Sequence, residues 1–169
     1  EAIADYMREN FYPHIRHVSI SAEIASEASA FQMKKNMEKT LIIAIAQSGT
    51  TKDTNTFIEM AKNRGASVIA LLNKRNGDIS YIADHTLYLG NGRDIEIAVP
   101  STKTYLCHLI LRYIFTLNVI SKISNDFKKL NTKLKEILKV SEIISVILKK
   151  NKITNTNILY KKFESNQNW

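Results

Sequence analysis

A group of small polar residues follows the most apolar short run of the chain. Residues 41–46 (Leu-Ile-Ile-Ala-Ile-Ala) precede residues 47–51 (Gln-Ser-Gly-Thr-Thr), and an amphipathic segment comes next. Free N–H groups and the positive dipole end of a helix N-terminus attract anions. Hydroxyl groups add donors, and glycine permits close backbone approach. These residues predict an anion-binding turn, although a plain strand-to-helix turn capped by Ser or Thr would contain the same residue types.

A second polar segment opens the longest apolar stretch. Residues 99–103 (Val-Pro-Ser-Thr-Lys) precede a run that is apolar on nearly all sides, and Ser101 is a good N-cap candidate. If both polar segments lie at one edge of a sheet, their two helix N-termini can hold two parts of one anionic, hydroxylated ligand.

The elements that position these segments alternate between strand and helix. Apolar alternation or short apolar runs predict strands, helical spacing predicts helices, and Arg64-Gly65 predicts a helix end. The expected strands are 17–24, 41–46, 67–72 and 85–89, and the expected helices are 2–11, 28–37, 51–64, 79–83, 101–120 and 127–150. This order predicts an α/β fold with a parallel sheet and helices on both faces. Ligands of such sheets bind beyond the carboxyl ends of the strands.

Composition sets the broad class. The chain has 169 residues, enough for one domain with its own core, and a single cysteine, Cys107. An internal disulfide is therefore excluded, and we expect a reducing, cytoplasmic location. No uninterrupted apolar run reaches the roughly 18 residues that a membrane span needs. Because the sequence opens on Glu1 without an initiator methionine, we interpret it as a piece of a longer chain.

Positive charge is concentrated at the C-terminal end. The net charge is +8, and residues 121–169 contain 11 lysines, no arginine and four acidic residues. Such a tail could contact nucleic acid or an anionic surface. Aromatic and arginine partners for bases are scarce there, so we interpret it as the solvated face of a helix and expect no nucleic-acid partner.

Three motifs resemble the sugar isomerase (SIS) domain family. Residues 46–54 (Ala-Gln-Ser-Gly-Thr-Thr-Lys-Asp-Thr) are similar to the family loop Ser-Gln-Ser-Gly-Glu-Thr-x-Asp-Thr, and residues 99–105 to its Val-Ala-Ser-Thr-Lys-x-Phe loop. Residues 23–27 (Glu-Ile-Ala-Ser-Glu) resemble the segment before its central strand. The resemblance covers about residues 1–120. It implies a flavodoxin-like three-layer sandwich and a sugar phosphate ligand, with no metal and no cofactor.

The resemblance also implies roles for individual residues. By position, Gln47, Ser48 and Thr51 hold the phosphate, with Gly49 and Thr50 completing the substrate-binding loop. Val99 and Ser101 line the sugar. No residue of this chain matches a catalytic acid or base of the family, so the catalytic residues stay unknown.

The sequence departs from the family pattern at several points. Ala46 replaces the first serine of the loop, Thr50 replaces its glutamate, and Pro100 replaces an alanine and removes a backbone donor. The first strand and Gly-Thr-Ser loop of the family are absent. So is the second SIS domain, which supplies the Glu, Lys and His that move protons in the relatives.

We therefore expect residues 1–122 to form an N-terminally incomplete SIS domain, and residues 123–169 to form a helical linker toward a second SIS domain. The leading hypothesis is the first half of an aldose–ketose phosphosugar isomerase, or of a related deglycase or aminotransferase, paired as a homodimer or with the second domain. The alternative is a non-catalytic sugar-phosphate sensor of a transcription regulator. A fragment whose binding site is vestigial is a third possibility.

Overall fold

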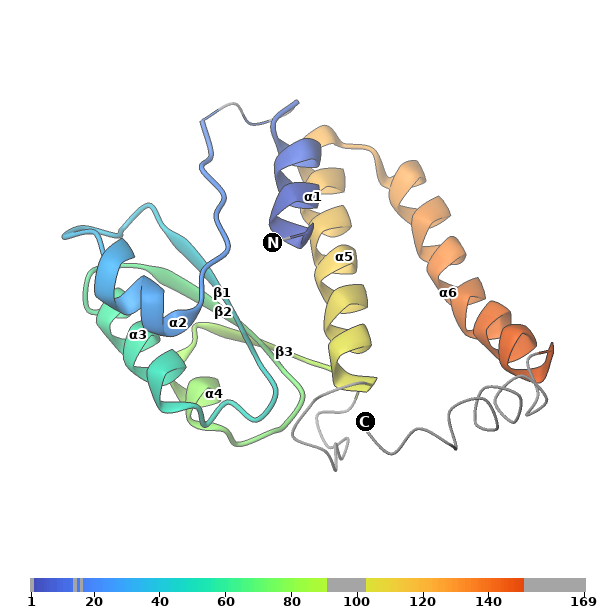
Figure 1. The fold of residues 1–169 in the computed structure, drawn as a ribbon. Coiled ribbons are helices and arrows are strands. Elements are labelled where there is room, and N and C mark those ends of the chain that lie inside the picture. Colours follow the sequence, from blue (N-terminus) through green and yellow to red (C-terminus); the bar gives the residue numbers. More distant parts are fainter. Residues whose placement is uncertain (1, 14, 16, 91–102, 151–169) are drawn as a thin grey trace, which may run out of the picture. The chain divides into compact units, whose positions relative to one another are not determined.

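Three parallel strands form the centre of the fold. The computed structural model describes residues 2–13, 15, 17–90 and 103–150 (Figure 1). Strands β1 (Leu41–Ala46), β2 (Ser67–Leu72) and β3 (His85–Tyr88) lie in the order β1-β2-β3. Both pairings are parallel, with Ala46 opposite Leu72 and Leu72 opposite Tyr88. The strands expected at 41–46 and 67–72 have the predicted bounds, and the third ends one residue early.

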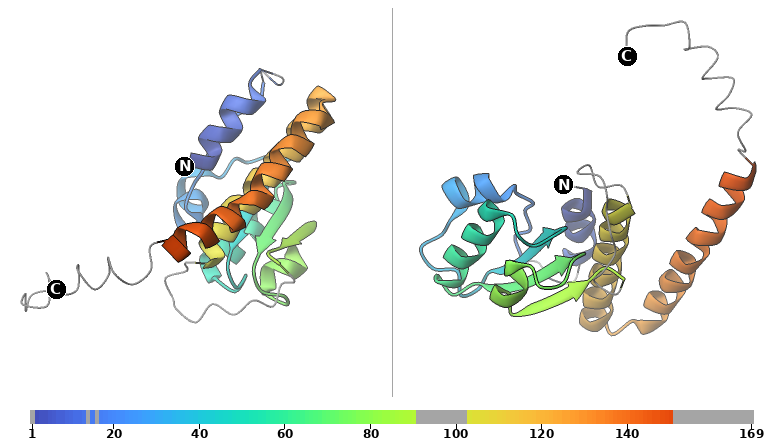
Figure 2. Two further views of the ribbon diagram at one scale, coloured as in Figure 1. Left: turned by 90° about the vertical axis from the view of Figure 1, so that its right-hand side faces the viewer. Right: turned by 90° about the horizontal axis from the view of Figure 1, so that it is seen from below.

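Helices cover both faces of this sheet. Helices α3 (Lys52–Lys62) and α4 (Asp78–Ile82) connect the strands. Helix α1 (Ala2–Phe11) precedes the three strands in the sequence, and α5 (Lys103–Ser124) follows them. Figures 1 and 2 show α3 and α4 on one side of the sheet and α1 and α5 on the other. The α/β class and the flavodoxin-like arrangement with helices on both faces are thereby confirmed.

The main core lies between the sheet and helices α3 and α4. Its buried members come from strands β1 and β2 and from helices α3 and α4: Ala44, Ile58, Val68, Ala70, Leu72 and Ile79. Helix α3 ends as its sequence predicts. Gly65 has φ +92°, and the N–H groups of Gly65 and Ala66 donate to the carbonyls of Lys62 and Ala61, at 2.9 and 3.1 Å.

The expected strand at residues 17–24 is wrong. The segment contains no helix or strand and pairs with no described strand, and β1 has β2 as its sole described neighbour. Alternating residues form a strand only when a second backbone completes the ladder. The Ile20 carbonyl instead accepts a hydrogen bond from Arg8 of α1, at 3.3 Å.

The expected helix at 28–37 is also wrong in its bounds. Helical structure covers α2 (Ala25–Glu27) and one π-helical turn, η1 (Ala28–Gln32). Further along, the Asn36 side chain accepts from the N–H of Glu38, which favours a turn. The Met37 N–H donates to the Arg64 carbonyl at 2.7 Å, and its side chain packs with Ala61 and Ala66. Tertiary contacts therefore end the helix before Met37.

The chain divides into two compact units, residues 1–120 and 121–169. Helix α5 belongs almost wholly to the first. Among the described helices, it alone is long and apolar enough to cross a membrane by length and composition, a test that core helices of soluble proteins also pass. In the second unit, α6 (Phe127–Lys150) confirms the expected helix. Residues 151–169, the rest of the expected linker, lie outside the described residues.

Candidate anion-binding site

The polar loop 47–51 connects the carboxyl end of β1 to the N-terminus of α3. This is the position where open parallel sheets bind ligands. Gln47 and Ser48 are half-buried, Gly49 is buried, and Thr50 and Thr51 are exposed. Gly49 has φ +73°, a conformation that a residue with a side chain adopts only at an energetic cost. The loop is thus partly open to solvent, and glycine is the residue that adopts its central conformation at the lowest cost.

Two hydroxyl groups of the loop lie together. Ser48 Oγ and Thr50 Oγ1 are 2.8 Å apart, and the Thr50 N–H donates to Ser48 Oγ at 3.4 Å. Thr51 occupies the N-cap position of α3 with extended φ and ψ angles (−68° and 120°), and its side chain makes no capping hydrogen bond. The first N–H groups of α3 therefore have no side-chain cap and can serve an anion.

A second loop holds the first in place. The N–H groups of Asn73 and Lys74 both donate to the Gln47 carbonyl at 3.1 Å, and the Ile79 N–H donates to the Gly49 carbonyl at 3.1 Å. The carbonyl groups of Gln47 and Gly49 are thus both occupied by N–H groups of the segment 73–79. These hydrogen bonds leave the hydroxyl groups and the helix N-terminus as the groups available to a ligand.

Gly77 allows this close approach. A Cβ atom on Gly77 would lie 2.1 Å from the Ser48 carbonyl oxygen and 3.0 Å from Gly49 Cα. The sequence analysis did not identify this supporting role of Gly77. The signal available in the sequence was a glycine in the loop between β2 and α4, since glycine permits close backbone approach.

Charges around the loop have both signs. Lys52 begins α3 and Lys74 is bound through its backbone to Gln47, and both side chains are exposed. Asp53 lies in the first turn of α3, whereas the Asp78 carboxylate accepts a hydrogen bond from Asn55 at 3.1 Å. Two exposed cations thus lie next to the loop, and one of the two nearby carboxylates is already paired.

His108 of α5 is a buried polar residue near this edge that the sequence analysis did not identify. It is 6% exposed. Burial lowers its pKa from 6.5 to about 4, the charge of Arg112 acts in the same direction, and the Ala46 backbone partly opposes both. The imidazole is therefore neutral at neutral pH. The influence of Ala46 places the end of β1 next to the ring.

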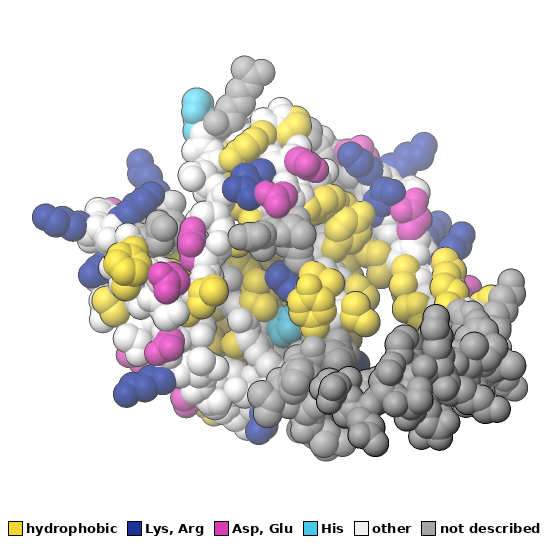
Figure 3. Space-filling view, viewed as in Figure 1, with side chains coloured by type: hydrophobic (Ala, Val, Ile, Leu, Met, Phe, Trp, Pro, Cys, Tyr) yellow, Lys and Arg dark blue, Asp and Glu magenta, His cyan; other side chains and the backbone are white. Residues whose placement is uncertain are grey.

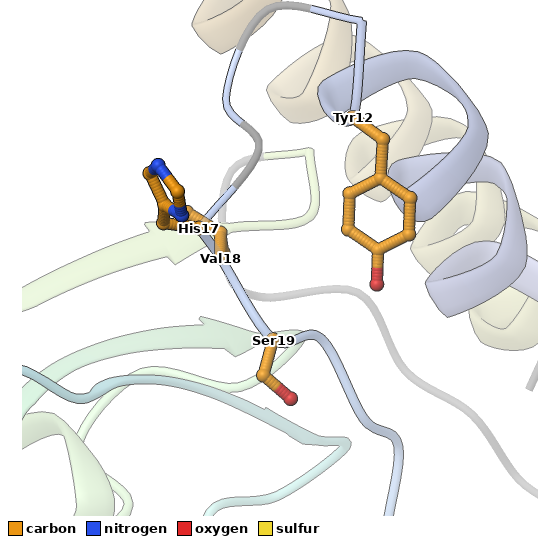
Figure 4. A pocket seen from close by; sticks show the side chains of 4 residues that line it. All are labelled: Tyr12, His17, Val18 and Ser19. Atoms are coloured by element: carbon orange, nitrogen blue, oxygen red, sulfur yellow. The ribbon is translucent and has the colours of Figure 1, made fainter.

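Two hollows of the described surface are lined by residues outside the loop. One, of about 450 Å³, is lined by Tyr12, His17, Val18 and Ser19, and a second, of about 370 Å³, by Asp5, Arg8 and residues 21–23. Figure 4 shows Tyr12 on one side of the first hollow, with His17 turned away from it. Both hollows are lined in part by the segment 17–24, which pairs with no described strand.

The structure brings together Gln47, Ser48, Gly49, Thr50 and Thr51. Val99 and Ser101 lie outside the described residues, so their place beside this loop stays a prediction. In the described part of the chain, no three His, Cys, Asp or Glu side chains are grouped as a metal site would require.

Comparison with known proteins points to one family. The SIS domain model matches residues 1–118. Glutamine–fructose-6-phosphate aminotransferase of Thermococcus kodakarensis is 38% identical over 133 residues, which cover 75% of this chain and 21% of that protein. The Clostridium tetani protein of the same name is 36% identical over 153 residues, covering 89% and 24%.

A solved structure agrees with this match. The C-terminal domain of glucosamine-fructose-6-phosphate aminotransferase from Francisella tularensis has a TM-score of 0.74 and 25% identity, covering 96% of this chain and 45% of that one. The chain belongs to the SIS domain family, and it resembles the isomerase half of the aminotransferases. It spans less than a quarter of the length of the Thermococcus relative and about a quarter of the Clostridium one.

Proposed function

We propose that the chain binds a phosphorylated sugar, with the phosphate held by the loop 47–51. Gln47, Ser48 and Thr51 contact the phosphate, Gly49 and Thr50 shape the loop, and Val99 and Ser101 line the sugar. The uncapped N-terminus of α3 beside two paired hydroxyl groups carries this proposal. A phosphate dianion matches such a site because it accepts hydrogen bonds and is stabilised by the helix dipole. No metal or cofactor is required.

The activity we propose for the whole protein is aldose–ketose isomerisation of a phosphosugar, or the related deglycase or aminotransferase chemistry. Moving a proton between two sugar carbons requires a positioned acid or base. Loop 47–51 supplies hydroxyl groups and an amide, and these are not bases at neutral pH. The chain therefore serves as the binding half, and the catalytic groups come from outside residues 1–169.

The domain organisation forms part of the proposal. Residues 1–122 constitute an SIS domain, and residues 123–169 lead toward a second one. One edge of β1 pairs with no described strand, and the segment 17–24 does not fill that place. Both observations support a sheet that accepts one more strand beside β1. The division of the chain after Ile120 supports the boundary.

We also propose a partner for the helices, either a second copy of the chain or a second SIS domain. Several large apolar side chains of α6 are exposed: Phe127, Leu138, Val140, Ile143, Ile144, Val146 and Ile147. Tyr105 and Leu106 of α5 are each 56% exposed. Figure 3 shows hydrophobic side chains over α1 and α5 on the face that it presents. Apolar surface of this extent favours association.

A cytoplasmic location completes the proposal. The names of the relatives describe enzymes that act on fructose 6-phosphate, which supports a place in metabolism. The sensor alternative is not favoured, because the Thermococcus and Clostridium relatives are aminotransferases by name.

Calorimetric titration of the full-length protein with fructose 6-phosphate, glucosamine 6-phosphate and inorganic phosphate tests the proposal. We expect Ser48→Ala to weaken phosphosugar binding by about 10- to 100-fold, because it removes a hydrogen bond to a charged group. Ser29→Ala is the matched control. The Ser29 hydroxyl donates to the Ser26 carbonyl within its own helical segment, at 2.8 Å.

Two results would contradict the proposal. One is wild-type protein that binds none of the three compounds at millimolar concentration. The other is a Ser48→Ala variant with unchanged affinity, which would place the phosphate elsewhere.

A further inference from the structure

One buried side chain has hydrogen-bonding capacity that the described residues do not use. His108 is more than nine-tenths buried, and neither Nδ1 nor Nε2 has a partner with hydrogen-bond geometry among the residues that the structure describes. The Ala46 backbone lies close enough to act on the ring without completing such a bond. Buried polar atoms are nearly always paired, because an unpaired one costs its lost hydration. An imidazole with two such nitrogens therefore needs a partner that the described residues do not supply.

The place of this ring relates it to the proposed site. His108 lies in the second turn of α5, the helix that follows the segment expected to line the sugar. Its imidazole is influenced by the backbone of Ala46, the last residue of β1. Gln47, the next residue, begins the loop 47–51. The ring thus lies on the α5 side of the strand end from which the loop starts.

The chemistry of the ring selects the kind of group that it can pair with. A neutral imidazole has one N–H donor and one acceptor nitrogen. A sugar hydroxyl also donates once and accepts, so the two groups are complementary. A phosphate dianion only accepts, and it is served by the N–H groups and hydroxyls at the start of α3.

We propose that His108 is a specificity-determining residue that hydrogen-bonds a hydroxyl group of the sugar whose phosphate occupies loop 47–51. This inference rests on the proposed function. Within α5, the backbone of His108 is already used, since its carbonyl accepts from Arg112 Nε at 3.0 Å. The ring nitrogens make no hydrogen bond to a described residue, so they remain available to a ligand hydroxyl group.

Titration of the full-length protein with fructose 6-phosphate and with inorganic phosphate tests the role. In His108→Leu, we expect affinity for fructose 6-phosphate to fall at least about tenfold, because a ligand hydroxyl is left unpaired in a buried place. Affinity for inorganic phosphate should stay within about twofold. His108→Gln, which keeps one donor and one acceptor, should recover most of the lost affinity. Cys107→Ala, one residue away on α5, is the control.

Thermal unfolding separates this role from a structural one. We expect the unliganded His108→Leu variant to melt at or above the wild-type temperature, since two orphaned polar atoms are removed. Equal fructose 6-phosphate affinity in the wild type and in His108→Leu would overturn the inference, and so would a parallel loss of phosphate binding. A crystal structure with a water molecule satisfying both nitrogens beside a bound sugar would also overturn it. Absence of phosphosugar binding in the wild type would instead remove the proposed function itself.

Discussion

The two faces of the sheet are closed to different degrees. On the face toward α3 and α4, the aligned residues Ala44, Ala70 and Leu72 are buried, with Ile58 of α3 0% exposed above them. On the opposite face, Leu71 is fully buried, but Leu41 and Ile45 of β1 are 53% and 41% exposed and Leu87 of β3 is 38% exposed. The same three strands thus present one completed core and one partly open surface.

This difference relates to what each face does. The closed face fixes the loop 47–51, because α3, α4 and the segment 73–79 that hydrogen-bonds to it all belong to that side. Among the described residues, the ring of His108 on the α5 side has no hydrogen-bond partner, and one edge of β1 pairs with no strand. The loop 47–51 therefore borders a surface with exposed apolar side chains and a histidine that lacks a described hydrogen-bond partner. The proposed ligand would pair with the histidine, and the proposed partner would cover the apolar side chains.

Truncating one side chain on each face gives the largest expected difference. Ile58→Ala should lower the free energy of unfolding by about 2–5 kcal/mol, because it leaves a cavity in a fully buried place. Ile45→Ala should cost less than about 1 kcal/mol in the isolated chain, since Ile45 is already 41% exposed. Urea unfolding measures both. Equal losses would mean that the second face is as closed as the first.

The contact between the two loops gives the next effect. Gly77→Ala should destabilise the chain by about 3 kcal/mol and abolish phosphosugar binding, because the new Cβ would overlap the Ser48 carbonyl oxygen. Asn76→Gly is the matched control on the same turn. Asn76 has φ +62°, which glycine adopts without cost, so stability should hold or rise slightly. Urea unfolding and calorimetry give the two readouts, and normal binding by Gly77→Ala would show that the second loop does not position the first.

The smallest effect is a pH dependence from the open face. Because the pKa of His108 is lowered from 6.5 to about 4, the unfolded chain binds more protons than the folded one between these values. The contribution of His108 to stability is thus fully present above pH 6.5, falls as the pH is lowered toward 4, and is constant below that.

Subtracting the pH profile of His108→Leu isolates this contribution. The pKa of the Asp84 carboxyl is also lowered, by its hydrogen bonds with Lys62 and the Val68 N–H, and its effect appears in both proteins. A flat difference between the wild-type and variant profiles from pH 7 to 4 would show that His108 is not held neutral by burial.

Local sequence was sufficient for elements whose signals are contained in one segment. The apolar runs of β1 and β2, the helical period of α6 and the Arg64-Gly65 end of α3 are all local patterns, and the structure matches them. The segment 17–24 alternates as a strand should, but a ladder needs a second backbone that no local pattern reports. The predicted helix 28–37 stopped early because Met37 is drawn into a contact with Arg64.

By itself, the sequence determined the polar loop after the central strand, the alternation of strands and helices, and the family resemblance, because each depends on residue type and spacing along the chain. Only the tertiary structure decided that Gly77 brings a second loop against Ser48, that His108 is buried beside the end of β1, and that one face of the sheet is closed while the other is not. These features join residues far apart in the sequence, and their energies come from contacts and burial that exist only after the chain has folded.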